Sequence, residues 1–155
     1  MSGGDLRDLY QEVILDHGKR PRNFRAIANA TRQARGHNPL CGDQLTVYLA
    51  LDDSGRVADV SFQGRGCAIS MASASMMTEL LKGKTEAEAR HIFAVFHAKM
   101  TGQPPPDGPA DQDAVDQLEV LSGVREFPMR VKCATLAWHA FTAALDGGDA
   151  TARTE

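Results

Sequence analysis

Long apolar runs are missing from this sequence, and none approaches the ~20 residues that a membrane-spanning helix needs. The opening stretch, MSGGDLRDLYQEV, carries too many charges for a secretory signal peptide. A basic excess is missing too, because the 17 Lys and Arg are scattered and stand against 20 Asp and Glu. We therefore expect a cytoplasmic protein that binds neither membranes nor nucleic acid.

Cysteine is scarce as well, with only Cys41, Cys67 and Cys133 in the chain. An odd number without an export signal argues against a disulfide framework, so we expect reduced thiols. A free cysteine is often no more than a small buried hydrophobe. The position of each cysteine in the fold therefore decides whether it has a chemical role.

Hydrophobic periodicity divides the chain into helices and strands. Apolar residues alternate in QLTVYLAL and VADVSFQG around the turn DDSG, which predicts a β-hairpin with one buried face. Helical spacing and composition predict helices over 5–17, 68–82, 85–100, 112–122 and 133–146. Thr85 followed by Glu88 predicts a capping box, and the prolines of TGQPPPDGPAD predict a surface loop.

These elements fit one domain. With 155 residues and 43% hydrophobic content, the chain is long enough for one core and too short to argue for two. We expect residues 1–155 to form a single α+β domain, with a small antiparallel sheet packed against helices. Gly147 and Gly148 should stop the last helix and leave a flexible tail from about residue 147.

All three cysteines fall at predicted element boundaries. Cys41 precedes the first hairpin strand in NPLCGDQL, Cys67 follows the second strand, and Cys133 opens the last helix. Unpaired N–H groups and the helix dipole should lower the pKa of the two cysteines at helix starts. Thiolates bind metals and attack electrophiles, whereas a core cysteine more often lies within an element.

The hairpin should bring these thiols together although their spacing matches no CxxC knuckle. A hairpin returns both ends to one side of its sheet, so Cys41 and Cys67 can meet beside Asp43. If Cys133 arrives from a packed helix, three sulfurs and one carboxylate supply the four ligands of a tetrahedral Zn²⁺ site. The carboxylate is a hard ligand in a soft set, so its bond should exchange readily. His37 could be a spare ligand, although a lone loop histidine is more often solvent-exposed.

Four segments resemble the U-type iron–sulfur assembly proteins, specifically the SufU branch: LYQEVILDHGKRPRN, NPLCGDQL, GRGCAISMASASMMTELLKGK and RVKCATLAWHAF. The resemblance runs from about Leu9 to Leu145 and keeps three cysteine motifs in order. Two features favour SufU over its relative IscU. One is the long, proline-containing stretch between Cys67 and Cys133, and the other is Lys132 in place of a histidine. The missing histidine argues against a cluster scaffold.

The resemblance implies a zinc-dependent sulfur acceptor for a PLP-dependent cysteine desulfurase of the SufS type, with downstream Suf scaffold components as further partners. It implies one Zn²⁺ per chain on Cys41, Asp43, Cys67 and Cys133. Cys41 would accept the persulfide sulfur, released when a desulfurase histidine takes over its zinc position. Arg130 resembles a family arginine near the site and could hold Asp43 or the released thiolate.

Three functions therefore remain open on residue chemistry alone. The site can accept sulfur, can assemble a transient [2Fe–2S] cluster on the same ligands, or can be a structural zinc site that mediates an interaction. The structural reading fits least well, because structural zinc sites usually use four Cys or His ligands without an exchangeable aspartate.

Overall fold

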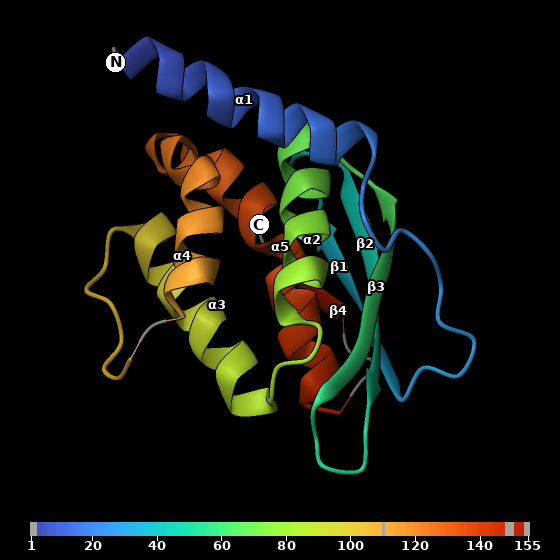
Figure 1. Ribbon diagram of the computed structural model, residues 1–155. Coiled ribbons are helices and arrows are strands. Elements are labelled where there is room, and N and C mark those ends of the chain that lie inside the picture. Colours follow the sequence, from blue (N-terminus) through green and yellow to red (C-terminus); the bar gives the residue numbers. More distant parts are fainter. Residues whose placement is uncertain (1–2, 110, 148–150, 154–155) are drawn as a thin grey trace.

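The computed structural model describes residues 3–109, 111–147 and 151–153. Helices gather on one side of a small sheet, and the first helix crosses one end of the molecule (Figure 1). In chain order the elements are α1 (Gly3–Lys19), β1 (Arg32–Asn38), β2 (Asp43–Leu51), β3 (Val57–Arg65), α2 (Ala68–Leu81), α3 (Glu86–Thr101), α4 (Gln112–Leu118), the 3₁₀ helix η1 (Glu119–Glu126), α5 (Pro128–Leu145) and β4 (Thr151–Arg153). The prediction of an α+β fold is confirmed.

The sheet has the strand order β3-β2-β1-β4. Strands β1, β2 and β3 are antiparallel neighbours, and β2 with β3 forms the predicted hairpin. The short strand β4 runs parallel to β1, within the segment for which the sequence predicts a flexible tail. Residues 148–150 and 154–155 of that segment lie outside the described part of the chain.

Strand β1 corrects the sequence interpretation, which treated its residues as loop. Its inward-facing residues are Ala34, Gly36 and Asn38, all buried, so the strand lacks the large apolar alternation that identifies β2. Gly36 is small for a reason, because a Cβ there would lie 3.1 Å from the side chain of Leu136 on α5. Strands are usually recognised in a sequence by alternating large apolar residues. Strand β1 lacks that alternation because α5 packs closely against it at a glycine.

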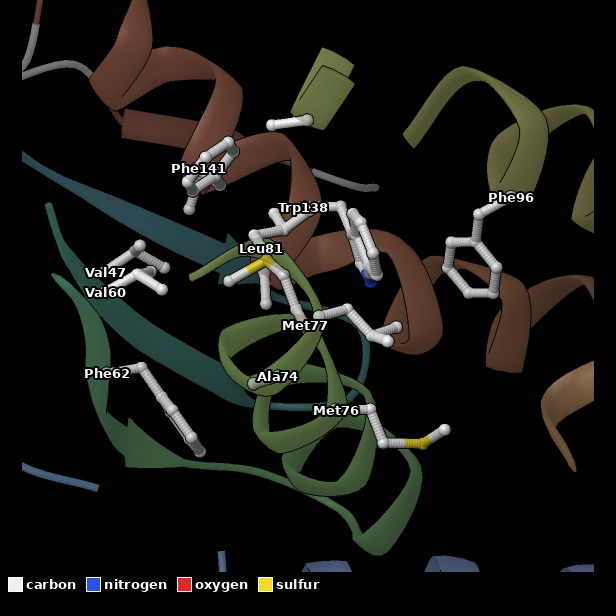
Figure 2. Packing of buried hydrophobic residues seen from close by; sticks show 14 of the residues in the cluster. Val47, Val60, Phe62, Ala74, Met76, Met77, Leu81, Phe96, Trp138 and Phe141 are labelled. Carbon is white, nitrogen blue, oxygen red and sulfur yellow. The ribbon is translucent and has the colours of Figure 1, made fainter. Parts of the chain in front are cut away.

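The core lies between the sheet and the helices α2 and α5. Val47 and Val60 point from the sheet toward α2 and toward Phe141 of α5 (Figure 2). The buried Trp138 of α5 packs on Phe96 of α3 with ring centroids 5.1 Å apart. Its indole N–H donates to Ser73 Oγ on α2 over 3.0 Å, so the polar tip of this large side chain is satisfied. These contacts hold α2 and α5 in a fixed relation.

Helix ends are predicted well where capping chemistry is local. Thr85 and Glu88 form the capping box of α3, as expected. The last helix is the exception, because α5 begins at Pro128 rather than at Cys133. Proline at the first helical position needs no N–H partner and has a helical φ, so the helix starts five residues earlier. Within the described residues, no helix is both long enough and apolar enough to span a membrane.

Candidate metal centre

Cys41 lies in the tight turn that joins β1 to β2. The backbone carbonyl of Asn38 accepts hydrogen bonds from the N–H of Cys41 at 3.3 Å and of Gly42 at 2.9 Å. Gly42 has a φ of +74°, which a residue without a Cβ adopts at little cost. The side chain of Cys41 is partly exposed, and a Cβ on Gly42 would touch nothing within 4 Å. The turn therefore presents Cys41 at the surface with open space beside it.

Asp43 is the first residue of β2 and is completely buried. Its Oδ1 accepts the backbone N–H of Cys67 over 2.9 Å, which links the start of β2 to the start of α2. Its Oδ2 is buried and finds no hydrogen-bond partner among the described residues. An unpaired buried carboxylate oxygen is costly, so this atom is positioned to bind a cation.

Cys67 is the N-cap residue of α2, as the boundary argument expected. Its sulfur accepts the N–H of Ser70 over 3.5 Å. A hydrogen bond from the thiol of Cys133, opposed by burial and aided by the Ser70 N–H, lowers the pKa of Cys67 to about 6. Cys67 is therefore the more acidic thiol of this pair.

Cys133 lies in the second turn of α5, so the prediction that it opens the helix is wrong. Its sulfur is buried, receives the side-chain N–H of Asn38 at 3.6 Å, and lies 3.6 Å from the carbonyl oxygen of Met129. Because Cys133 donates the hydrogen bond to Cys67 and is desolvated, its pKa is raised. A metal ion that binds here must displace the Cys133 proton, which couples binding to pH.

Three of the four predicted ligands lie close together in the structure. One ligand atom from each of Cys41, Asp43 and Cys133 lies within 4.8 Å of the other two. Cys67 is not part of that mutually close group, but its backbone N–H donates to Asp43 over 2.9 Å, which places it next to the group. Three sulfurs and one unpaired carboxylate oxygen match the ligand types of a four-coordinate zinc site, so the residues fit Zn²⁺.

Arg130 is an exposed residue on the first turn of α5. Its guanidinium lies beside Cys67 and Cys133, and the negative charge of these thiols raises its pKa. The structure thus places this arginine against the two anchored sulfurs. Three thiolates and a carboxylate exceed the charge of one Zn²⁺, so a nearby cation offsets part of the remaining negative charge.

Two residues of the site were not singled out from the sequence. Asn38, fully buried, holds the Cys41 turn through its carbonyl and Cys133 through its amide. Gly66 precedes Cys67, and a Cβ at Gly66 would lie 2.7 Å from Asp43 Oδ1 and 3.1 Å from Ser70 Oγ. Both belong to the cysteine motifs NPLCGDQL and GRGC, yet only the packing reveals why asparagine and glycine stand there.

We predict that Gly66→Ala weakens zinc binding about tenfold, as loss of outer-shell support typically does. The added methyl would lie 2.7 Å from Asp43 Oδ1, so the Asp43 carboxylate must shift from the position in which it accepts the Cys67 N–H. Gly123→Ala is the matched control, since a Cβ there meets nothing within 4 Å. Competition with a chromogenic zinc chelator measures both affinities, and equal values for the two variants would contradict the packing argument.

The chain matches a known domain family over most of its length. Residues 9–146 match the NifU-like N-terminal domain family. The zinc-dependent sulfurtransferase SufU of Bacillus subtilis (strain 168) is 42% identical over 138 residues, which cover 88% of each chain. The iron-sulfur cluster assembly scaffold protein IscU of Streptococcus pyogenes serotype M1 is 37% identical over 145 residues, or 94% of this chain and 87% of that one.

Solved structures agree in fold. FiSufU of Fervidobacterium islandicum AW-1 superposes with a TM-score of 0.79 at 34% identity, over 90% of this chain and 98% of that one. The N-terminal part of a NifU-like protein from Brucella abortus has a TM-score of 0.77 at 25% identity, over 91% of this chain and 94% of that one. The arrangement of sheet and helices is therefore shared along nearly the whole length of these proteins.

Proposed function

Because the chain belongs to the NifU-like N-terminal domain family, its function lies in iron–sulfur cluster assembly, and we propose that it is a zinc-dependent sulfur acceptor. The sulfur donor is a PLP-dependent cysteine desulfurase of the SufS type. The observation that carries this proposal is the unequal packing of the three cysteines. Cys41 lies on a glycine turn with open space, whereas Cys67 caps one helix and Cys133 is buried in another.

The proposed ligands of one Zn²⁺ are Cys41, Asp43, Cys67 and Cys133. Zinc, when bound, keeps thiols deprotonated and protects them from oxidation. The carboxylate of Asp43 is held at Oδ1 by the Cys67 N–H, which leaves Oδ2 for the ion. Zinc exchanges an oxygen ligand more readily than a sulfur ligand. This ligand set therefore suits a site whose zinc coordination changes during sulfur transfer.

Transfer itself is a thiolate attack on a persulfide. The Cys41 sulfur attacks the outer sulfur of the desulfurase persulfide, the bond between the two donor sulfurs breaks, and the donor cysteine leaves as a thiolate. One sulfur–sulfur bond forms as another breaks, so no external oxidant or reductant is needed. The Cys41 persulfide then passes its sulfur to a downstream Suf scaffold component, which regenerates the thiolate.

The surface around the site suits a protein partner. Leu40 and Phe127 are each 59% exposed and Met129 is 53% exposed, and these three apolar side chains flank Cys41 and Arg130 in the sequence. Large apolar side chains exposed next to a reactive group are typical of protein–protein contact sites. They favour a donor that arrives on another protein over a free small molecule.

Arg130 is proposed to offset the negative charge of Cys67 and Cys133 while Cys41 leaves and returns. We predict that Arg130→Gln accepts sulfur about tenfold more slowly with zinc still bound, because a charge-assisted contact is lost at an exposed position. Arg125→Gln, an exposed arginine one turn before α5, is the matched control. Single-turnover transfer from a persulfidated desulfurase measures both rates, and identical rates would exclude this role for Arg130.

A transient [2Fe–2S] scaffold on the same four residues is the second candidate. Three thiolates and a carboxylate can hold such a cluster, and a relative named as a scaffold covers 94% of this chain. Metal analysis of the purified protein separates the two. The proposed function requires one zinc per chain and no iron or acid-labile sulfide, whereas a scaffold acquires both iron and sulfide when supplied with a desulfurase and cysteine.

A further inference from the structure

The outer face of the sheet carries a hollow that the thiol chemistry does not use. Its volume is about 670 Å³, and its side chains come from three adjacent strands. They are Arg35 and His37 of β1, Gln44 and Thr46 of β2, and Arg65 of β3. The positions on β1 and β2 alternate with buried residues, and Arg65 pairs with Gln44, so these side chains face away from the helices. His37, considered above as a spare ligand, thus lies on the face opposite the thiols.

The strand register places the basic side chains in a fixed pattern. His37 pairs with Gln44, and Gln44 pairs with Arg65, so these three residues form one row across the sheet. Arg35 lies in the next row on the same face, paired with Thr46. Neighbouring strands are ~4.8 Å apart, so the backbones of His37 and Arg65 are separated by roughly 10 Å.

The hollow carries basic side chains although the chain as a whole has a net charge of −3. Among the described residues, its lining contains two arginines and a histidine and no acidic residue. Arg22, Arg25 and Arg90 each form an ion pair with an aspartate or glutamate. Within the described part of the chain, neither Arg35 nor Arg65 forms such a pair, so both charges are available to a ligand.

We propose that this hollow binds an acidic segment of a protein partner that carries at least two carboxylates. Complementary charge and the open, three-strand-wide shape support the inference, because Arg35 and Arg65 lie on the two outer strands of the three and suit two anionic groups better than one phosphate. Asn38 and Asp43 of the thiol site directly adjoin His37 and Gln44 in the chain. A segment bound here would therefore place its protein beside the Cys41 turn, whatever metal or cluster the thiols hold.

The test uses the zinc-loaded protein and a hexaglutamate peptide at low salt, followed by backbone amide NMR. We expect the signals of residues 35–37, 44–46 and 64–65 to shift and the affinity to fall as salt is added. Arg35→Gln with Arg65→Gln should weaken peptide binding about tenfold. Arg20→Gln with Arg56→Gln makes the same change in net charge at exposed sites outside the hollow and should weaken it less than about twofold.

The remaining outcomes overturn the proposal. Equal weakening by the two double variants would mean general charge attraction, and absence of shifts in the hollow would mean that it is not a peptide site. Pyrophosphate that binds the same residues more tightly than hexaglutamate at equal ionic strength would identify a small-anion site instead. Tighter binding of a single-stranded RNA oligonucleotide would identify a nucleic-acid surface.

Discussion

Cys41→Ser protein should take up no sulfur from a cysteine desulfurase, and its stimulation of desulfurase turnover should fall at least about 100-fold. A serine hydroxyl at this turn is no substitute, because it remains protonated at neutral pH and cannot displace a thiolate from a persulfide. Protein folding should be unaffected, since Cys41 lies on a turn with open space beside it. Desulfurase turnover of L-cysteine, followed as alanine formation, measures the loss.

The other two cysteines provide the comparison for this prediction. Cys67→Ser and Cys133→Ser remove an anchored ligand from a helix cap and from the core, so zinc should dissociate readily from both. Cys41→Ser leaves those anchors and Asp43 in place and should keep more zinc than either. Undiminished stimulation by Cys41→Ser would disprove its role as the acceptor. Full zinc content in a Cys67→Ser, Cys133→Ser double variant would disprove the shared site.

Asp43→Ala should bind zinc about 10- to 100-fold less tightly, in the range of losses that follow from disturbing a metal site's supporting contacts. The substitution removes the oxygen ligand and also the acceptor for the Cys67 N–H. Asp43→Asn separates these effects, because its amide oxygen can still accept that N–H while the negative charge is lost. Zinc competition titrations should rank wild type above Asp43→Asn and Asp43→Asn above Asp43→Ala.

The same variants distinguish sulfur acceptance from cluster assembly. If the protein is a sulfur acceptor, Asp43→Ala incubated with iron, cysteine and a desulfurase should remain colourless after desalting. If it is a scaffold, loss of the exchangeable oxygen should stabilise the cluster. A durable visible absorption from an iron–sulfur centre in Asp43→Ala would therefore favour the scaffold function.

The parts of the fold that the sequence predicts are those with local signals. The β2–β3 hairpin follows from alternation around DDSG, and the start of α3 follows from the capping box at Thr85. Strand β1 gives no such signal, because Gly36 and Asn38 face inward where large apolar residues would mark a strand. The predicted start of the last helix at Cys133 is five residues late, because the prediction did not use Pro128, which stands at the first helical position.

The candidate site, like the fold, is predicted from the sequence only in part. The β2–β3 hairpin brings Cys67 to Asp43, whereas Cys133 reaches Cys41 and Asp43 only because α5 packs against the sheet. The hydrogen bond of Asp43 to the Cys67 N–H depends on how β2 meets α2, which is a tertiary contact. The need for glycine at position 66 likewise depends on a side chain distant in sequence. Sequence patterns therefore predict the ligand types, and packing decides their geometry.

Mapping the persulfide shows directly whether Cys41 receives sulfur from a desulfurase. Zinc-loaded wild-type protein is incubated with a PLP-dependent cysteine desulfurase and L-cysteine, then alkylated and digested without reductant for mass spectrometry. We expect one additional sulfur atom on the peptide that contains Cys41 and none on the peptides of Cys67 and Cys133. Persulfide on Cys133, or on no peptide of this chain, would contradict this expectation.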